Sequence, residues 1–192
     1  MSDAMSNIAA IILAAGSSSR LGEPKQLVEY FGERLLDRAL RITQQANVQK
    51  IYIVLGANAD LIQATCNLSG AIVLLNEDWA TGMASSIRTG IAALPVTTQQ
   101  ALILTCDQPA ANADHLVALL TIASNHNTSS ASTYAGKIGT PAVFAERVFP
   151  ALLQLEGDVG ARTLLQAEDI VTLPLPDGEF DIDTPEDLAA IN

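Results

Sequence analysis

The chain has 192 residues, of which 49% are hydrophobic and 4% aromatic, and its formal net charge at pH 7 is −11. A chain of this length can bury well over half of its unfolded surface, and this composition argues against an intrinsically disordered chain. The excess of acidic residues disfavours binding to nucleic acid and to anionic membranes, so we expect neither as a partner. An anionic small molecule would bind only where basic residues gather or a metal ion bridges the charges.

The cysteines and the N-terminal residues bear on the cellular compartment. Cys66 and Cys106 are too few for a disulfide framework and lack metal-ligand spacing, so we expect two small buried hydrophobic side chains. Residues 1–7 are polar, without the pattern of a signal peptide, and predict a disordered tail. The apolar run 8–15 is too short for a membrane span. We therefore expect a cytoplasmic protein in which residues 8–192 form a single domain.

Short apolar runs alternate with amphipathic stretches along the chain. In chain order they predict strand 8–15, helix 35–46, strand 50–55, helix 60–66, strand 71–75, helix 82–94, strand 101–105, helix 113–124, strands 130–134 and 142–144, helices 145–153 and 159–166, strand 170–173 and helix 185–191. Strands that are almost wholly apolar predict a three-layer α/β fold, with a mainly parallel sheet covered by helices on both faces. Ligands of such sheets bind at the C-terminal ends of the strands, which selects the segments after Ala15, around Gly82 and at Asp107.

The segment LAAGSSSRLGEPK, residues 13–25, follows the first strand and has what a triphosphate needs. Its small residues allow backbone N–H groups to approach phosphates, its serines add donors, and Arg20 and Lys25 supply positive charge. It is neither a Walker loop nor a dinucleotide fingerprint. Small residues alone would also fit an ordinary turn, and the two cations favour phosphate binding. The candidate nucleotide-binding residues here are Leu13, Ala14, Ala15, Gly16, Ser17 and Lys25.

Aspartates at two further places are candidates for Mg²⁺ binding. Asp107 ends an expected strand, and its carboxylate suits a hard ion that bridges phosphates, although an Asx turn would also place an aspartate there. Asp181 and Asp183 lie two residues apart, so an extended chain would put both on one face, near one ion. Thr184 and Asp187 also fit the start of a helix.

Further candidates lie at expected helix starts and loops. Gly82, Ser85 and Ser86 open the helix 82–94, where the serines either cap the helix or contact the base or ribose of a nucleotide. The remaining candidates, for the phosphate of a second substrate, are Lys137, Gly139 and Arg162. His115 and His126 are expected in or near a surface helix and receive no role.

The segment 13–25 resembles the L-A-x-G-x-S-x-R-[MLF]-G-x-x-K signature of the nucleotidyltransferases that include the molybdenum cofactor cytidylyl- and guanylyltransferases. The resemblance extends through GMASSIR (82–88), CDQP (106–109), GKIGTPAVF (136–144), GDVGAR (157–162) and DIDTPEDL (181–188). It implies a Rossmann-like domain of the glycosyltransferase-A type, with Arg20, Lys25 and Asp107 as catalytic residues. It also implies Mg²⁺ bound by Asp107 together with the second aspartate segment, where Asp181 is the first choice and Asp183 assists or caps.

Ala15 favours the cytidylyltransferase branch, because the guanylyltransferases resemble L-A-G-G at this place. The resemblance then implies transfer of CMP from CTP to the phosphate of molybdopterin, with release of pyrophosphate, and a molybdoenzyme or its chaperone as protein partner. Such an acceptor is already anionic near pH 7 and needs no general base. The alternatives are a guanylyltransferase, a sugar- or polyol-phosphate nucleotidyltransferase, and a nucleotide-binding module without catalysis. A Rossmann oxidoreductase is weakened by the missing fingerprint.

Overall fold

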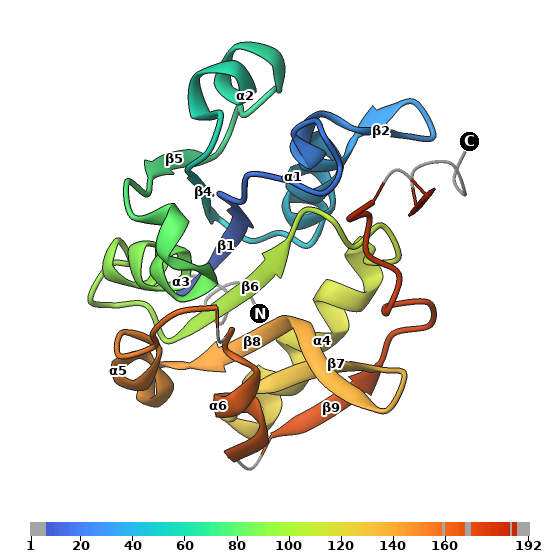
Figure 1. Ribbon diagram of the computed structural model, residues 1–192. Helices are drawn as coiled ribbons and strands as arrows, with labels where there is room; N and C mark the ends of the chain where they lie inside the picture. The colour runs from blue at the N-terminus through green and yellow to red at the C-terminus, as the bar shows by residue number, and fades with distance from the viewer. Residues whose placement is uncertain (1–6, 159, 168–169, 185, 188–192) are drawn as a thin grey trace.

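The computed structural model describes residues 7–158, 160–167, 170–184 and 186–187. A seven-stranded sheet with the order β5-β4-β1-β6-β8-β7-β9 forms its centre (Figure 1). All neighbouring strands are parallel except for β8, which is antiparallel to both β6 and β7. The strands are β1 (Ile8–Ala14), β4 (Lys50–Leu55), β5 (Ile72–Leu75), β6 (Gln100–Thr105), β7 (Ser130–Tyr134), β8 (Lys137–Ala145) and β9 (Val171–Pro174).

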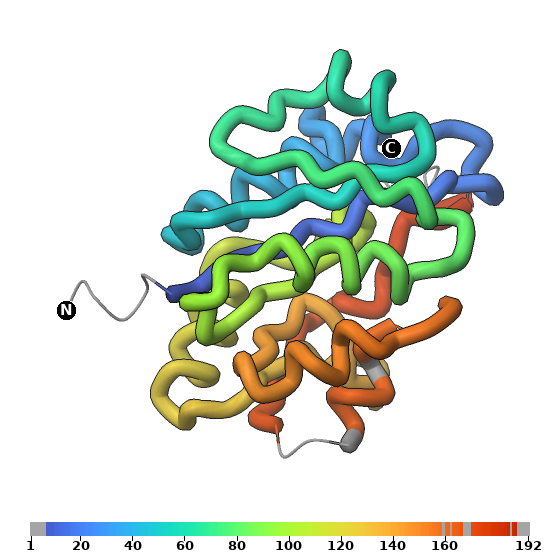
Figure 2. Tube along the Cα trace, turned by 90° about the vertical axis from the view of Figure 1, so that its left-hand side faces the viewer, coloured from blue at the N-terminus to red at the C-terminus, as the bar shows by residue number. Residues whose placement is uncertain are grey.

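Helices cover both faces of the sheet, as the three-layer prediction requires. They are α1 (Leu35–Gln45), α2 (Ala59–Thr65), α3 (Met83–Ala92), α4 (Ala113–His126), α5 (Phe149–Leu152) and α6 (Arg162–Ala167), with short 3-10 helices η1 (Lys25–Leu27), η2 (Trp79–Thr81) and η3 (Glu146–Val148). Both views place α2 and β9 at opposite ends of the molecule (Figure 2). Among the described residues, no helix combines the length and apolarity that crossing a bilayer demands.

The alternation of side chains along β1 explains why its sequence is continuously apolar. Ile12 belongs to the core that contains residues of α1 and α4, whereas Ile11 belongs to the core that contains residues of α3 and α5. Both side chains are fully buried. Because successive strand residues point to opposite faces, a strand covered on both sides needs an apolar residue at every position. The apolar run therefore identified a buried strand correctly.

Most predicted elements appear within a few residues of their expected bounds, and the differences have local causes. The hairpin of β2 (Glu29–Tyr30) and β3 (Glu33–Arg34) was missed, because strands of two residues carry no periodicity. Strand β8 begins at Lys137, five residues before the predicted strand, in a stretch where glycine, threonine and proline hide its strand character.

Three predicted segments lie partly outside the described residues. Residues 1–6 of the expected tail, Val159 of the helix 159–166 and most of the helix 185–191 lie outside them. The backbone oxygen of Asn7 accepts a hydrogen bond from the Gln99 N–H at 2.8 Å.

The buried histidine and the two buried cysteines fit structural roles. The ring of His115 is buried in the contact between α4 and β7, with Nε2 2.8 Å from the hydroxyl of Ser132, and burial lowers its pKa. This corrects the expectation of a surface histidine. Cys66 and Cys106 are buried, as predicted. Burial raises the pKa of Cys66 to about 11 and also raises that of Cys106, which keeps both thiols protonated.

Candidate functional site

A cavity of about 570 Å³ opens beside the C-terminal ends of β1 and β6. The segments after Ala15, around Gly82 and at Asp107 all line it, so the structure brings together the three places selected from the sequence. A volume of this size suits a nucleotide-sized ligand. Its lining residues are Leu13, Ala14, Ala15, Gly16, Ser17, Ser19, Arg20, Lys25, Gln26, Trp79, Ala80, Gly82, Met83, Ser86, Thr105, Cys106, Asp107 and Asp158.

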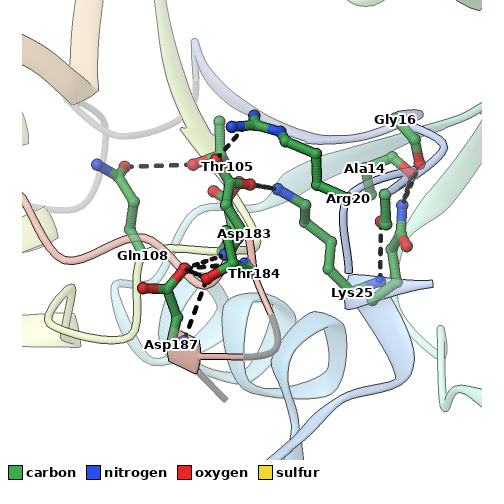
Figure 3. Close-up of polar contacts among 12 residues, drawn as sticks. Ala14, Gly16, Arg20, Lys25, Thr105, Gln108, Asp183, Thr184 and Asp187 are labelled. Atoms are coloured by element: carbon green, nitrogen blue, oxygen red, sulfur yellow. Dashed lines mark hydrogen bonds and ion pairs between the residues drawn. The ribbon is translucent and has the colours of Figure 1, made fainter. Parts of the chain in front are cut away.

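The ammonium group of Lys25 joins two carboxylates at the cavity. Figure 3 shows the Lys25 side chain extending toward Asp183. Its Nζ donates to Asp107 Oδ2 at 2.8 Å and also to Asp183 Oδ1. The other oxygen of Asp183, Oδ2, lies 3.3 Å from the Arg20 guanidinium. The Lys25 side chain is only 16% exposed, so solvent screens these interactions weakly. Three segments that are far apart in the sequence thus meet in one ionic cluster.

The charges of this cluster shift two pKa values. Burial by itself lowers the pKa of Lys25, but the charges and hydrogen bonds of Asp107 and Asp183 outweigh it, so this pKa is raised above its ordinary value. Burial raises the pKa of Asp181, and the negative charges of Asp107 and Asp183 raise it further, to about 7. Asp181 therefore carries only part of a negative charge at neutral pH, whereas Lys25 stays fully charged.

Backbone and side-chain contacts hold the second aspartate segment beside Asp107. The Ile182 N–H donates to the backbone oxygen of Asp107 at 3.1 Å. Asp187 Oδ2 accepts from the backbone N–H groups of Asp183 and Thr184, at 3.1 and 2.8 Å, and the Asp187 N–H donates to Thr184 Oγ1 at 3.2 Å. This reciprocal pair has the contacts of the capping arrangement expected at Thr184 and Asp187. It leaves the Asp183 carboxylate available to Lys25 and Arg20.

Gln26 fixes the backbone of the loop that follows β1. Its side chain is 1% exposed, and its Nε2 donates to the carbonyl oxygens of Ala14 at 2.7 Å and Gly16 at 3.1 Å. Its Oε1 accepts no hydrogen bond from any residue that the structure describes, so the polar contribution of the side chain lies in its two donors. In the same loop, Ser18 Oγ accepts from the backbone N–H of Lys25 at 2.9 Å. These contacts couple the shape of the loop to the position of Lys25.

Gly82 precedes α3, where a second loop packs closely against it. Its φ is +112°, and a Cβ there would lie 2.5 Å from the backbone of Gly157 and 2.6 Å from Asp158 Oδ1. The Ala84 N–H donates to the oxygen of Gly157 at 3.1 Å. Any larger residue at position 82 would push this loop away, which explains the glycine. The contact also places the Asp158 carboxylate at the cavity.

Two of the three residues expected on the acceptor side lie outside the cavity. Lys137 is exposed at the start of β8, and Gly139 packs in β8 against the Tyr134 hydroxyl; neither lines the cavity. Arg162 begins α6, and its side chain lies outside the described part of the structure. A role in acceptor binding stays a prediction for all three. Ser85 is buried beside the cavity, and Ser86 lines it.

Several cavity residues escaped the sequence reasoning. Gln26 and Trp79 line the cavity and belong to none of the motifs, whereas Met83 and Asp158 lie within GMASSIR and GDVGAR but received no role there. One signal was present, since Trp79 is the sole tryptophan of the chain and lies three residues before Gly82. Within the described residues, no group of three or more His, Cys, Asp or Glu side chains is arranged to hold a metal ion by itself.

Comparisons with known proteins identify chains that are similar over most of their length. The sequence model of the MobA-like NTP transferase domain matches residues 10–171. Nicotine blue oxidoreductase of Paenarthrobacter nicotinovorans is 32% identical over 193 residues, covering 94% of each chain. Molybdenum cofactor cytidylyltransferase of Escherichia coli K12 is 25% identical over 186 residues, covering 95% of this chain and 94% of that protein. The crystal structure of Rv0371c from Mycobacterium tuberculosis H37Rv is 28% identical, with a TM-score of 0.86 over 97% of both chains.

The role of Gln26 in the loop can be tested by Gln26→Met, which keeps the length of the side chain and removes both donors. The buried carbonyl of Ala14 and the half-buried carbonyl of Gly16 then lose a partner, and we expect the free energy of unfolding to fall by about 1–3 kcal/mol in urea denaturation. The matched control is Gln63→Met on α2, where an exposed amide donates to Ala59 at 3.4 Å, with an expected change within about 0.5 kcal/mol. Equal stability of Gln26→Met and the wild type would contradict the assignment.

Proposed function

Because the chain belongs to the MobA-like NTP transferase family, we propose that it transfers CMP from CTP to the phosphate of molybdopterin and releases pyrophosphate. Membership makes the protein a nucleotidyltransferase that acts on a nucleoside triphosphate and a phosphate-bearing acceptor. The observation that carries the finer proposal is the cavity, where the small-residue loop with Ala15 meets the cluster of Lys25 and Asp107.

The proposed reaction needs charge neutralisation and alignment more than proton transfer. An oxygen of the acceptor phosphate forms a bond to the α-phosphorus of CTP, and the bond from that phosphorus to the oxygen bridging to the β-phosphorus breaks. Pyrophosphate leaves with that oxygen. Both reactants are anionic, so Lys25 and Arg20 would lower their repulsion and hold the triphosphate in line. The acceptor oxygen is already ionised near pH 7, and no general base is required.

We assign the divalent cation, with Mg²⁺ as the ion proposed, to Asp107 and Asp183. Both carboxylates bind one cationic group, the ammonium of Lys25, so their oxygens converge on one point, and this supports their assignment to a hard cation. When bound, the ion would neutralise phosphate charge during transfer. The same oxygens cannot serve Lys25 and the ion fully at once, so the two compete. Asp181, two residues before Asp183, stays a further candidate ligand, as the resemblance implies.

The choice of CTP rests on Ala15 and on the similarity to the cytidylyltransferase of Escherichia coli. A probable molybdenum cofactor guanylyltransferase of a Nostoc strain is also similar, at 28% identity, so the base preference needs a direct measurement.

The similarity to nicotine blue oxidoreductase supports a second candidate, an oxidoreductase on this fold. The absence of G-x-G-x-x-G from the sequence argues against nicotinamide dinucleotide binding of the Rossmann type.

Pyrophosphate release tests the proposal against its alternatives. We expect release to be fastest with CTP, and to require both Mg²⁺ and molybdopterin, when CTP, GTP and ATP are compared. Fastest pyrophosphate release with GTP would make the protein a guanylyltransferase. Pyrophosphate release only when a sugar phosphate takes the place of molybdopterin would identify the sugar phosphate as the acceptor. Oxidation of NADH or NADPH by a dye without any pyrophosphate would contradict the proposal and favour the oxidoreductase.

Asp107→Asn tests the cation assignment, because the amide keeps the shape of the carboxylate and removes its charge. We expect turnover to fall by roughly a hundredfold or more, while the circular dichroism spectrum stays that of the wild type. Asp114→Asn, at an exposed position in the first turn of α4, removes the same charge outside the cavity and should keep its turnover. Turnover of Asp107→Asn within a few fold of the wild type would exclude Asp107 from the reaction.

A further inference from the structure

Asn76, which follows β5, has a side-chain orientation that its partners determine completely. Its Oδ1 accepts from the backbone N–H of Asp78 at 3.0 Å. A backbone N–H only donates, so the amide oxygen must face it and the NH₂ group must point the other way. The two amide hydrogens go to the hydroxyl oxygens of Ser85 at 2.8 Å and Ser86 at 3.0 Å. Asn76 is 5% exposed, so water does not replace these bonds.

The two serines differ in whether their hydroxyl groups already donate a hydrogen bond. Ser85 Oγ donates its hydrogen to the oxygen of Gly82 at 2.8 Å, so both of its roles are filled. Ser86 Oγ accepts from Asn76, and no residue within the described ranges accepts its hydrogen. A hydroxyl has one hydrogen, so the Ser86 hydroxyl can still donate one hydrogen bond. The residue is 5% exposed and lines the cavity, so the hydrogen can reach a bound ligand there.

We propose that Asn76 is a positioning residue that makes Ser86 a hydrogen-bond donor to the nucleobase of the bound nucleotide. The inference rests on the proposed function and deepens it. The cations of the cavity, Arg20 and Lys25, are held at the carboxylate cluster, which is where phosphates would bind. Ser86 instead shares the lining with Trp79 and Met83, whose apolar surfaces suit a base. The base atom facing Ser86 is then an acceptor, a carbonyl oxygen or an unprotonated ring nitrogen.

Asn76→Asp reverses the polarity of this contact at constant shape. The carboxylate can still accept from the Asp78 N–H, but it cannot donate, so the Ser86 hydrogen turns toward it and a lone pair faces the base. We expect the affinity for CTP to fall roughly three- to tenfold, the size of one neutral hydrogen bond, and Ser86→Ala to lose a similar factor. Trp79, as the sole tryptophan and a cavity residue, reports binding by its fluorescence.

A double-mutant cycle separates positioning from charge and packing. If Asn76 acts through Ser86, Asn76→Asp costs no further affinity in the Ser86→Ala background. Inorganic tripolyphosphate, which has no base, should bind all four proteins equally. The matched control is Asn67→Asp, where an exposed asparagine accepts from the Ser69 N–H at 3.2 Å in the same local geometry and the added charge lies outside the cavity.

Three outcomes overturn the inference. The first is an equal loss of CTP affinity from Asn76→Asp with and without Ser86, and the second is a parallel loss of tripolyphosphate affinity. The third is Ser86→Ala with wild-type CTP affinity, which decides the matter even if Asn76→Asp does not fold. A wild-type protein that binds no nucleoside triphosphate would overturn the proposed function as well, and this outcome is recognised before any variant is made.

Discussion

The pairing of one ammonium group with two carboxylates is the interaction on which the site depends. Asp107 and Asp183 both contact Lys25, which is 82 residues away from the first and 158 from the second. Two carboxylates this close would repel each other without a cation, since partial burial weakens the screening by water. The ammonium between them therefore offsets this repulsion where the loop after β1, the end of β6 and the segment before Thr184 meet.

The backbone geometry of the fold brings these three charged groups to the same place. Strands β1 and β6 are parallel neighbours, so the residues that follow them emerge at one edge of the sheet. The hydrogen bond from Ile182 to Asp107 brings the C-terminal segment to the same edge, and Gln26 holds the loop that leads to Lys25. Each charged group thus reaches the cluster from a segment whose course other contacts already fix.

The sequence was informative where a residue's chemistry and its local context coincide. The loop with Lys25, the strand end at Asp107 and the start of a helix at Thr184 were all found, because each signal lies within a few residues. Gln26 and Asn76 were missed, because their roles depend on hydrogen-bond partners that only the folded sheet brings close to them, such as the carbonyl of Ala14 for Gln26. For the same reason nothing local revealed that Lys137 lies away from the cavity.

Binding of Mn²⁺ without nucleotide tests the central claim, that Asp107 and Asp183 form a cation site filled by Lys25 in the free protein. Lys25→Met removes the competing ammonium and keeps its apolar stem. The account predicts that this variant binds Mn²⁺ about tenfold or more tightly than the wild type in an electron paramagnetic resonance titration, and that adding Asp183→Asn abolishes the gain. An affinity of Lys25→Met no higher than that of the wild type would contradict it.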